Sequence, residues 1–211
     1  MMKRLFDFVL SAIGLLVLAP FFVIFSLLIW LTDWGPVFFV QTRVGRGGRP
    51  FRMLKFRSMR VGSDLGSTLT IGADKRITKI GHLLRRGKVD ELPQLWNVFI
   101  GDMSLVGPRP EIQKYVDQYS SKQLAVLELK PGITDPASFA LYDESDVLSR
   151  QADPEKYYVE HLMGEKIRIN LEYAARASLA TDVLLVLSTV GRMFGLKLDI
   201  FSLLKIQPIK I

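Results

Sequence analysis

Residues 89–95 read Val89-Asp90-Glu91-Leu92-Pro93-Gln94-Leu95, and the prediction of the fold starts from them. Two adjacent carboxylates stand at the expected start of a helix, where Asp90 is a suitable N-cap and Pro93 a suitable first-turn residue. Apolar residues then follow at helical spacing, and Gly101 can end the helix: Leu92, Leu95, Trp96 and Phe99. Taken alone, this pattern is typical of a capped helix that packs on a core.

Basic segments flank the carboxylate pair, Arg85-Arg86-Gly87-Lys88 before it and Gly107-Pro108-Arg109-Pro110 after it. Arginines at a helix C-terminus are ordinary, so Arg85 and Arg86 can simply end a helix near 75–86. Yet a carboxylate can also attack a phosphoryl centre, and nearby cations, a helix N-terminus and Mg²⁺ neutralise the charge of a pyrophosphate donor. Asp90 and Glu91 are therefore also candidates for a phosphoryl-transfer site.

An apolar segment opens the chain, from Leu5 to Leu31, and Asp7 is its only charged residue. As a straight helix these residues would be about 40 Å long, more than the roughly 20 residues that span a bilayer. The segment is too long for the apolar region of a signal peptide, and no small-residue cleavage site follows it before Asp33. It is therefore predicted to be a retained membrane segment.

Pro20 interrupts this segment and is expected to kink or break the helix. The pieces on either side, 5–19 and 21–31, would be about 22 and 16 Å long, and neither alone crosses a hydrocarbon core of about 30 Å. Cationic flanks prefer the cytoplasm, and they lie on both sides: Lys3 and Arg4 before the segment, Arg43, Arg46, Arg49 and Arg52 after it. A re-entrant helix-break-helix over 1–35 is favoured over a spanning helix.

Composition limits the partners of the chain. Its 211 residues carry a net charge of +7, which indicates an anionic partner such as nucleic acid, anionic membrane lipids or a phosphorylated substrate. No RRM, KH or helix-turn-helix pattern is present, so nucleic acid is disfavoured. The chain has no cysteine, which excludes disulfides and thiolate metal sites. Between residues 43 and 60 there are seven cations and no acid: Arg43, Arg46, Arg49, Arg52, Lys55, Arg57 and Arg60.

The fold class predicted is mainly α with few short strands (α+β). The re-entrant helix and interfacial amphipathic helices accompany a compact cytosolic catalytic domain over 36–180, followed by an interfacial or packing segment over 181–211. A short strand is expected at 37–40, a partly extended segment at 51–56, and a mobile loop at 63–73. Helices are expected near 75–86, 111–128 and 153–177. Val183 to Val190 is favoured as core, and Ile200 to Ile206 as a second interfacial piece.

Several motifs in this order resemble those of the small monotopic phosphoglycosyl transferases, the bacterial sugar transferases that start glycan assembly on a polyprenol carrier. The resemblance covers residues 3 to about 190. The matching segments are Lys3-Arg4-Leu5-Phe6-Asp7 with Pro20, Gln41-Thr42-Arg43-Val44-Gly45, Lys55-Phe56-Arg57-Ser58-Met59, Asp90 to Val98, Gly101 to Pro110, and Lys130-Pro131-Gly132-Ile133-Thr134.

The resemblance implies transfer of a phosphosugar from a nucleoside diphosphate sugar, usually a UDP-sugar, to polyprenol (undecaprenyl) phosphate. The products would be a polyprenol diphosphate sugar and UMP, made at the cytoplasmic face of the bacterial inner membrane. By the same resemblance Asp90 is the nucleophile and helps to hold Mg²⁺, and Glu91 assists, for instance in deprotonating the lipid phosphate. Phosphate-binding positions are matched by Lys55, Arg85 and Arg109, with Arg57 and Arg86 in support.

Two segments depart from the family pattern. Many members have Ser-Pro at the membrane break, where this chain has Ala19-Pro20, and many continue the Pro-Gly-Ile-Thr motif with glycine, where this chain has Asp135-Pro136-Ala137-Ser138. The sequence therefore leaves the sugar open, together with the oligomeric state, including a homo-oligomer. The alternative function is a non-catalytic membrane module that binds anionic lipids or glycan-assembly partners.

Overall fold

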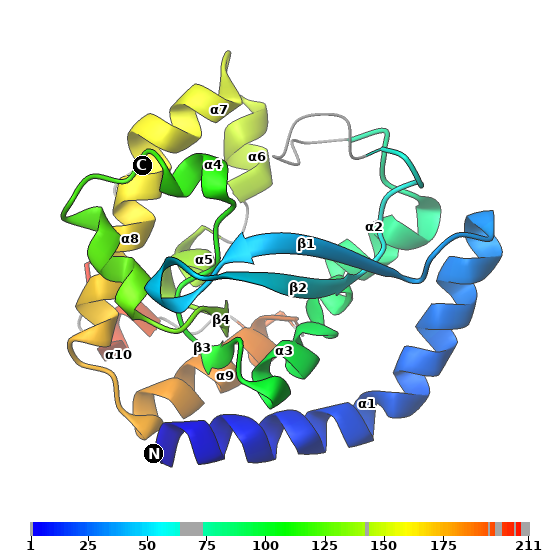
Figure 1. The fold of residues 1–211 in the computed structure, drawn as a ribbon, viewed down its shortest axis with the longest axis horizontal. Helices are drawn as coiled ribbons and strands as arrows, with labels where there is room; N and C mark the ends of the chain where they lie inside the picture. Colours follow the sequence, from blue (N-terminus) through cyan, green and yellow to red (C-terminus); the bar gives the residue numbers. More distant parts are fainter. Residues whose placement is uncertain are drawn as a thin grey trace.

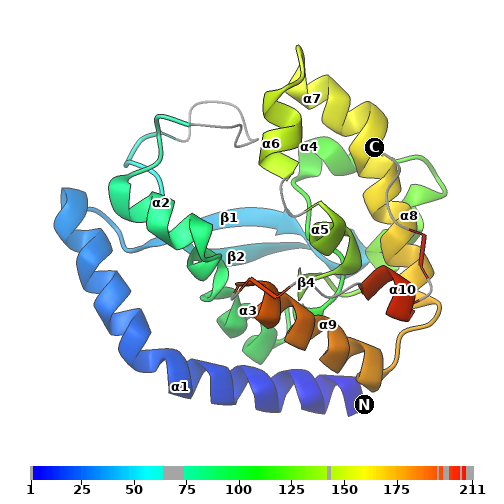
Figure 2. The same ribbon diagram turned by 180° about the vertical axis from the view of Figure 1, so that it is seen from behind.

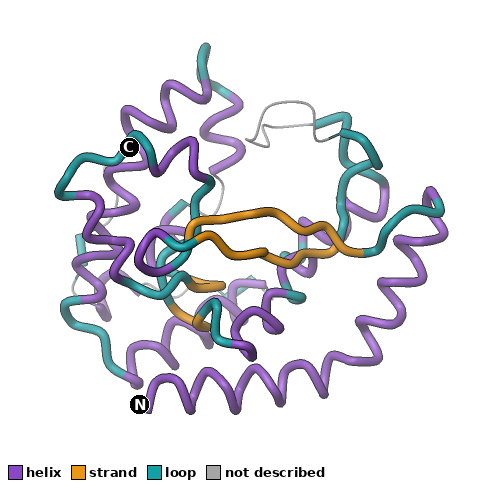
Figure 3. Tube along the Cα trace, viewed as in Figure 1, coloured by secondary structure: helices purple, strands orange, loops and turns teal. Residues whose placement is uncertain are grey.

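The computed structural model of the chain describes residues 2–63, 74–141, 144–193, 195–196, 200–204 and 206–207. Helices dominate and the strands are short, which confirms the mainly helical α+β class (Figure 3). The helices and strands are α1 Met2–Asp33, β1 Phe38–Val44, β2 Pro50–Phe56, α2 Lys79–Arg86, α3 Gln94–Ile100, β3 Ser104–Val106, α4 Gln113–Val116, β4 Gly132–Thr134, α5 Pro136–Ala140, α6 Glu144–Ser149, α7 Pro154–Tyr157, α8 Met163–Ala174, α9 Leu179–Met193 and α10 Ile200–Leu204.

Helix α1 contains Pro20 and bends partway along its length (Figure 1). Proline lacks the N–H of an internal hydrogen bond and its ring clashes with the preceding turn, so it kinks a helix. The arm before Pro20 (the first arm) packs under α3, where the rings of Phe8 and Phe99 stack at 4.9 Å. The arm after Pro20 (the second arm) packs on β2, where Phe22 lies 5.5 Å from Phe56. Both arms thus contact the same globular body.

Most of the surface of α1 is apolar and exposed. Within the described part of the chain, α1 is the one helix long and apolar enough to cross a membrane by length and composition. Only 6% of its most apolar window is buried, and Leu16 is 77% exposed. An apolar surface of this extent marks a contact with a membrane or a partner. Helix α1 is therefore not the central core helix of a globular domain.

Strands β1 and β2 form an antiparallel hairpin across the body of the protein (Figure 1), paired from Phe38 opposite Phe56 to Val44 opposite Pro50. The strand expected at 37–40 is confirmed but continues to Val44, and the segment expected to be partly extended at 51–56 forms β2. The side chain of Asn97 on α3 bonds to the backbone of β2: its Oδ1 accepts from the Leu54 N–H at 3.0 Å, and its Nδ2 donates to the Arg52 carbonyl at 2.8 Å. Helix α3 is thereby fixed against β2.

A second, two-stranded parallel pair joins segments far apart in sequence. Strand β3 lies beside β4, with Ser104 opposite Gly132 and Val106 opposite Thr134. The two backbones approach so closely that a Cβ at Gly132 would lie 2.1 Å from the Gly107 nitrogen. Since any side chain would clash there, glycine is required at this position. The pairing brings the segment ending at Arg109 next to the segment beginning at Lys130.

The main core lies between α3, the β3–β4 pair, α8 and the C-terminal helices. The C-terminal segment contributes buried Leu185, Ile200 and Leu204 to it, while Leu187 on α9 is 62% exposed. The prediction of Ile200 to Ile206 as an interfacial piece is therefore wrong, because most of its described apolar side chains pack in the core. Seen from behind, α9 lies beside the first arm of α1 (Figure 2), and Lys3 Nζ lies 2.5 Å from the Asp182 carboxylate. Helix α9 therefore packs on the core with one face and leaves an apolar residue exposed on another.

The helix predicted over 111–128 is wrong. The chain instead forms the single turn α4 and a 3-10 helix, Gln123–Glu128. Between them, Ser120 and Gln123 bond to each other's backbone N–H groups, at 2.7 and 3.4 Å, and such side-chain bonds compete with a continuous helix. The helical path over 153–177 is confirmed up to Ala174, with Asp153 capping Lys156 N and a π-helical segment at Tyr158–Leu162. Residues 64–73 of the expected mobile loop lie outside the described residues.

Candidate active site

Asp90 and Glu91 lie on a 3-10 helix, Val89–Glu91, that connects α2 to α3. Helix α3 begins only at Gln94 and has no side-chain cap, so the prediction of Asp90 as an N-cap is wrong. The reason is local: Lys88 adopts a left-handed conformation (φ 54°), and its carbonyl accepts a bond from the Glu91 N–H at 3.2 Å, which closes the 3-10 turn. A non-glycine residue in this conformation stores strain, a feature that clusters at functional sites.

Glu91 is largely buried, with its side chain 13% exposed, and it binds two cations. Its Oε1 accepts hydrogen bonds from Lys55 Nζ at 2.9 Å and from Arg109 Nη2 at 2.5 Å. Its Oε2 accepts one from Arg109 Nη1 at 3.2 Å. Burial alone would raise the pKa of Glu91, but Arg109 and Lys55 outweigh it and hold that pKa well below the usual glutamate value. Glu91 is therefore an ionised carboxylate whose oxygens are occupied by the protein's own donors.

Asp90 has the opposite environment. It is 7% exposed, and no described residue donates a hydrogen bond to its carboxylate or forms an ion pair with it. Burial and the charge of Glu91 raise the pKa of Asp90 above the usual aspartate value, although Lys55, Arg85 and Lys88 oppose the shift. Asp90 is thus a carboxylate in a field of cations whose oxygens are not engaged by the described protein groups.

Arg85 reaches this region because α2 packs closely on the segment after β2. A Cβ at Gly81 would lie 1.9 Å from the Ser58 carbonyl oxygen, so only glycine allows this approach. Arg85 Nε donates to Ser58 Oγ at 2.8 Å. Burial lowers the pKa of Arg85, and the charge of Asp90 is the largest contribution that raises it. The Arg85 guanidinium therefore acts electrostatically on the Asp90 carboxylate.

Two of the predicted site residues lie apart from this cluster. The Arg57 guanidinium is buried and forms an ion pair with Asp33 at the end of α1. Arg86 is exposed at the end of α2, with no side-chain partner among the described residues. The structure thus gathers Lys55, Arg85 and Arg109 around the carboxylate pair and leaves Arg57 and Arg86 outside it.

A second group of polar residues behind Arg109 was not singled out from the sequence. Tyr158 donates to the Glu111 carboxylate, and Lys166 Nζ lies 3.0 Å from the Glu144 carboxylate. Tyr158 and Lys166 line a cavity of about 40 Å³ that also reaches Arg109. These residues are spread over the helices after Pro110, and no short motif connects them. The nearest signal was the departure of residues 135–144 from the family pattern.

The described residues contain no cluster of three or more His, Cys, Asp or Glu side chains suited to a metal ion. Mg²⁺ needs few protein ligands, because it is usually held by one or two carboxylates together with substrate phosphates and water. Glu91 is occupied by Lys55 and Arg109, whereas the Asp90 oxygens are open to a ligand. The site fits a magnesium ion held by Asp90 and a bound diphosphate.

The arrangement suits chemistry on an anionic phosphate ester. A free carboxylate can act as a nucleophile towards phosphorus, and cations stabilise the charge of the phosphoryl group during the transfer. Glu91 holds Lys55 and Arg109 at the carboxylate pair, and the charges of Lys55 and Arg85 act on Asp90.

Comparisons with known proteins agree on one family. A model of the bacterial sugar transferases matches residues 1–195. The chain is 38% identical over 204 residues to the UDP-glucose:undecaprenyl-phosphate glucose-1-phosphate transferase of Xanthomonas campestris pv. campestris, covering 92% of this chain and 39% of that protein. It is 37% identical over 194 residues to the protein of the same name from Caulobacter vibrioides, covering 89% and 68%.

A third relative has a different sugar in its name. The chain is 36% identical over 192 residues to the UDP-N-acetylgalactosamine-undecaprenyl-phosphate N-acetylgalactosaminephosphotransferase of Aeromonas hydrophila, covering 89% of this chain and 42% of that protein. The chain therefore spans 39% and 42% of the lengths of two of these relatives and 68% of the third.

Proposed function

Because the chain belongs to the bacterial sugar transferase family, we propose that it transfers a phosphosugar from a nucleoside diphosphate sugar to polyprenol phosphate. The names of the relatives support a UDP-sugar as donor and undecaprenyl phosphate as acceptor. The products are a polyprenol diphosphate sugar and UMP. The relatives differ in their sugar, glucose in one name and N-acetylgalactosamine in another, and a panel of UDP-sugars will identify the donor of this chain.

The proposed reaction has two steps, both at the phosphorus that bears the sugar. In the first, an Asp90 oxygen bonds to this phosphorus and the bond to the UMP oxygen breaks, which releases UMP. In the second, an oxygen of the polyprenol phosphate attacks the same phosphorus, the bond to Asp90 breaks, and the carboxylate is regenerated. The single observation that supports this assignment is the buried Asp90 carboxylate, unpaired among the described residues and acted on by Lys55 and Arg85.

The other charged residues of the site bind and orient phosphate in this proposal. Lys55 and Arg109 contact the diphosphate while Glu91 holds them in place, and Arg85 adds positive charge on the side of Asp90. When Mg²⁺ is bound, it neutralises diphosphate charge, with Asp90 as its protein ligand. The ionised state of Glu91 favours an electrostatic role over proton transfer from the lipid phosphate, whose second ionisation is largely complete at neutral pH.

The test of this function is UMP release. The chain in detergent or vesicles is incubated with a panel of UDP-sugars, with and without undecaprenyl phosphate and Mg²⁺. We expect sustained UMP release only when donor, lipid acceptor and Mg²⁺ are all present, with one donor preferred. No UMP release from any donor, together with retained binding to anionic vesicles, would instead support a non-catalytic membrane module.

The proposed location is the cytoplasmic face of the bacterial inner membrane, with α1 as a re-entrant helix. The support is that both ends of α1 bond to the same globular body: Lys3 pairs with Asp182, and Asp33 pairs with Arg57. A helix that crossed the bilayer would separate these ends by about 30 Å of hydrocarbon. With the bend at Pro20 directed into the lipid, both ends remain in water.

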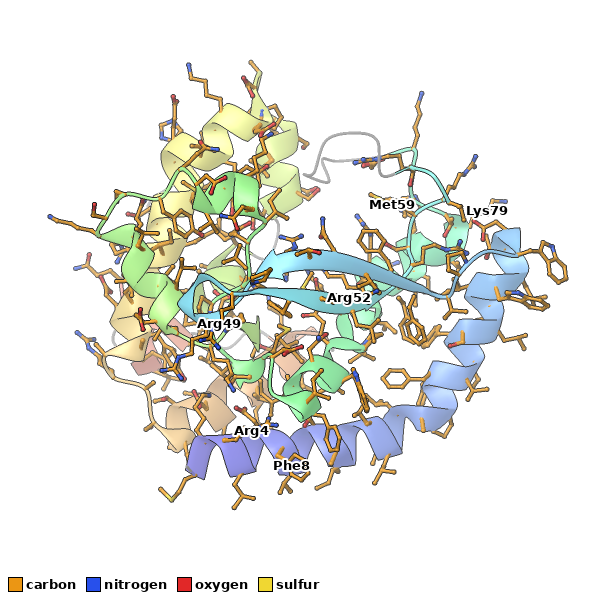
Figure 4. All side chains as sticks on the ribbon, in the orientation of Figure 1. Arg4, Phe8, Arg49, Arg52, Met59 and Lys79 are labelled. Atoms are coloured by element: carbon orange, nitrogen blue, oxygen red, sulfur yellow. The ribbon has the colours of Figure 1, made fainter. Side chains whose placement is uncertain are left out.

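Cysteine labelling tests this topology, since the chain has no cysteine of its own. Met2→Cys and Arg49→Cys, at exposed positions (Arg49 is labelled in Figure 4), are expected to react with an impermeant maleimide only in inside-out vesicles. Leu16→Cys is the control and should remain unlabelled from either side until detergent is added, because it is expected to lie in lipid. Labelling of the first two from opposite sides would establish a spanning helix.

A further inference from the structure

Three polar residues of α1 bond to the three segments that carry the proposed catalytic residues. Asp33, the last residue of α1, pairs with Arg57, two residues after Lys55. Arg4 donates to the carbonyls of Val98 (2.5 Å) and Phe99 (2.7 Å) at the end of α3, the helix that follows Asp90 and Glu91.

The third bond involves the only charged residue inside the apolar segment. Asp7 is 2% exposed, and its Oδ1 accepts from the Leu105 N–H on β3, the strand that leads to Arg109, at 3.1 Å. Figure 4 shows Arg4 and Phe8 on the arm of α1 that lies beneath α3. Helix α1 is thus bonded separately to the elements next to Lys55, to the carboxylate pair and to Arg109.

We propose that Asp33 and Arg57 are positioning residues, which hold the end of β2 and with it Lys55 on the second arm of α1. The proposal rests on the proposed function for its kinetic part only. It assigns to Arg57 a contact with the membrane helix in place of a contact with substrate phosphate. On this basis α1 orients the catalytic residues in addition to holding the protein at the membrane.

The packing around Arg57 supports a fixed geometry. Arg57 is 6% exposed, and its second terminal nitrogen is buried without a hydrogen-bond partner among the described residues, so Asp33 is the compensating charge within that part of the chain. A Cβ at Gly35 would lie 2.1 Å from that nitrogen, so the chain leaving α1 lies directly against the guanidinium. The guanidinium thus has little room to turn towards another anion.

The contact continues along the backbone to Lys55. The Arg57 N–H donates to the Val37 carbonyl at 2.9 Å, next to the hairpin. Phe56, between Lys55 and Arg57, is 1% exposed and packs on Phe22 of the second arm. Lys55 Nζ in turn bonds to Glu91. A displacement of the second arm therefore changes the position of Lys55 relative to the carboxylate pair.

A double-mutant cycle in the full chain tests the proposal against direct substrate binding by Arg57. Arg57→Gln, Asp33→Asn and the double variant are each expected to lower kcat by a similar factor, roughly ten- to a hundredfold, with the donor KM near wild type. Direct phosphate binding would give a raised donor KM for Arg57→Gln, no such rise for Asp33→Asn, and independent effects in the double variant. That result would overturn the proposal. Lys79→Gln, an exposed cation at the start of α2 (Figure 4), is the control.

A second measurement does not depend on turnover. Spin labels on Leu31→Cys in the second arm and Arg52→Cys in β2, both exposed, report the distance between α1 and the hairpin. We expect a narrow distance distribution with the pair intact and a clearly broader or shifted one with Asp33→Asn; an unchanged distribution would overturn the proposal. Absence of turnover in the wild type would refute the proposed function, and the label distances would still decide whether the pair holds β2 on α1.

Discussion

Asp90→Asn is expected to abolish turnover and, at the same time, to raise the melting temperature. The amide has nearly the same shape but cannot form the covalent bond to phosphorus, so kcat should fall by at least about a thousandfold. Burial and the adjacent charge of Glu91 raise the pKa of Asp90, which means that its ionised form is unfavourable in the folded protein. Removing this charge should stabilise the fold by roughly 1 kcal/mol, or about 2–4 °C.

Turnover by UMP release and thermal unfolding in the same detergent measure the two effects. Asp146→Asn, an exposed aspartate on α6, is the control and should change neither quantity. The sign of the stability effect also depends on pH. Because the folded pKa of Asp90 is raised, the advantage of the asparagine variant should shrink as the pH falls through that value and the wild-type carboxyl becomes neutral. Wild-type turnover in Asp90→Asn would refute Asp90 as the nucleophile.

Glu91→Gln should have the opposite effect on stability. The carboxylate compensates two partly buried cations, Lys55 and Arg109, and its removal leaves them without this partner. Because the Arg109 side chain is 34% exposed, the loss is expected to be smaller than for a fully buried pair, about 2 kcal/mol. Turnover should also fall, by roughly a hundredfold, because the donors of Lys55 and Arg109 lose the carboxylate that orients them.

The loss of stability in Glu91→Gln should depend on pH, because the pKa of Glu91 is lowered in the folded protein. The stabilisation is fully present above the pKa of an unfolded glutamate, about 4.3, and is lost as the pH falls through the lower pKa of the folded protein. Unfolding measured at pH 7 and at progressively lower pH should therefore show a difference between wild type and Glu91→Gln that vanishes in strong acid. A Glu91→Gln variant as stable as the wild type at pH 7 would contradict the structure of the site.

Features set by local sequence were predictable. The length and apolar character of residues 5–31 predicted a membrane segment with a break at Pro20, and the structure has a long, mostly exposed apolar helix that contains this proline. Helix α2 and the end of α3 at Gly101 also follow from local periodicity and capping. The parallel pairing of β3 with β4 was not predictable, because each strand has three residues and pairing depends on a contact across more than twenty residues of chain.

The order of the motifs indicated that the carboxylate pair, Lys55, Arg85 and Arg109 belong to the site. It did not indicate which carboxylate bonds to which cation. All three side-chain bonds of Glu91 come from residues distant in sequence, and only the folded chain shows that Asp90 is left without a described partner. The ion pair of Arg57 with Asp33 likewise joins residues distant in sequence and is visible only in the folded chain. A cation in a basic loop has no local signature that distinguishes a contact with substrate from a contact with another helix.

Trapping the covalent intermediate tests the central claim most directly. The protein is mixed with its preferred UDP-sugar and Mg²⁺ in the absence of polyprenol phosphate, quenched rapidly and digested for mass spectrometry. We expect a phosphosugar on the peptide that contains Asp90, a matching burst of UMP of one equivalent or less per protein, and neither in Asp90→Asn. UMP release that requires the lipid acceptor and leaves no adduct, or an adduct on a different residue, would contradict it.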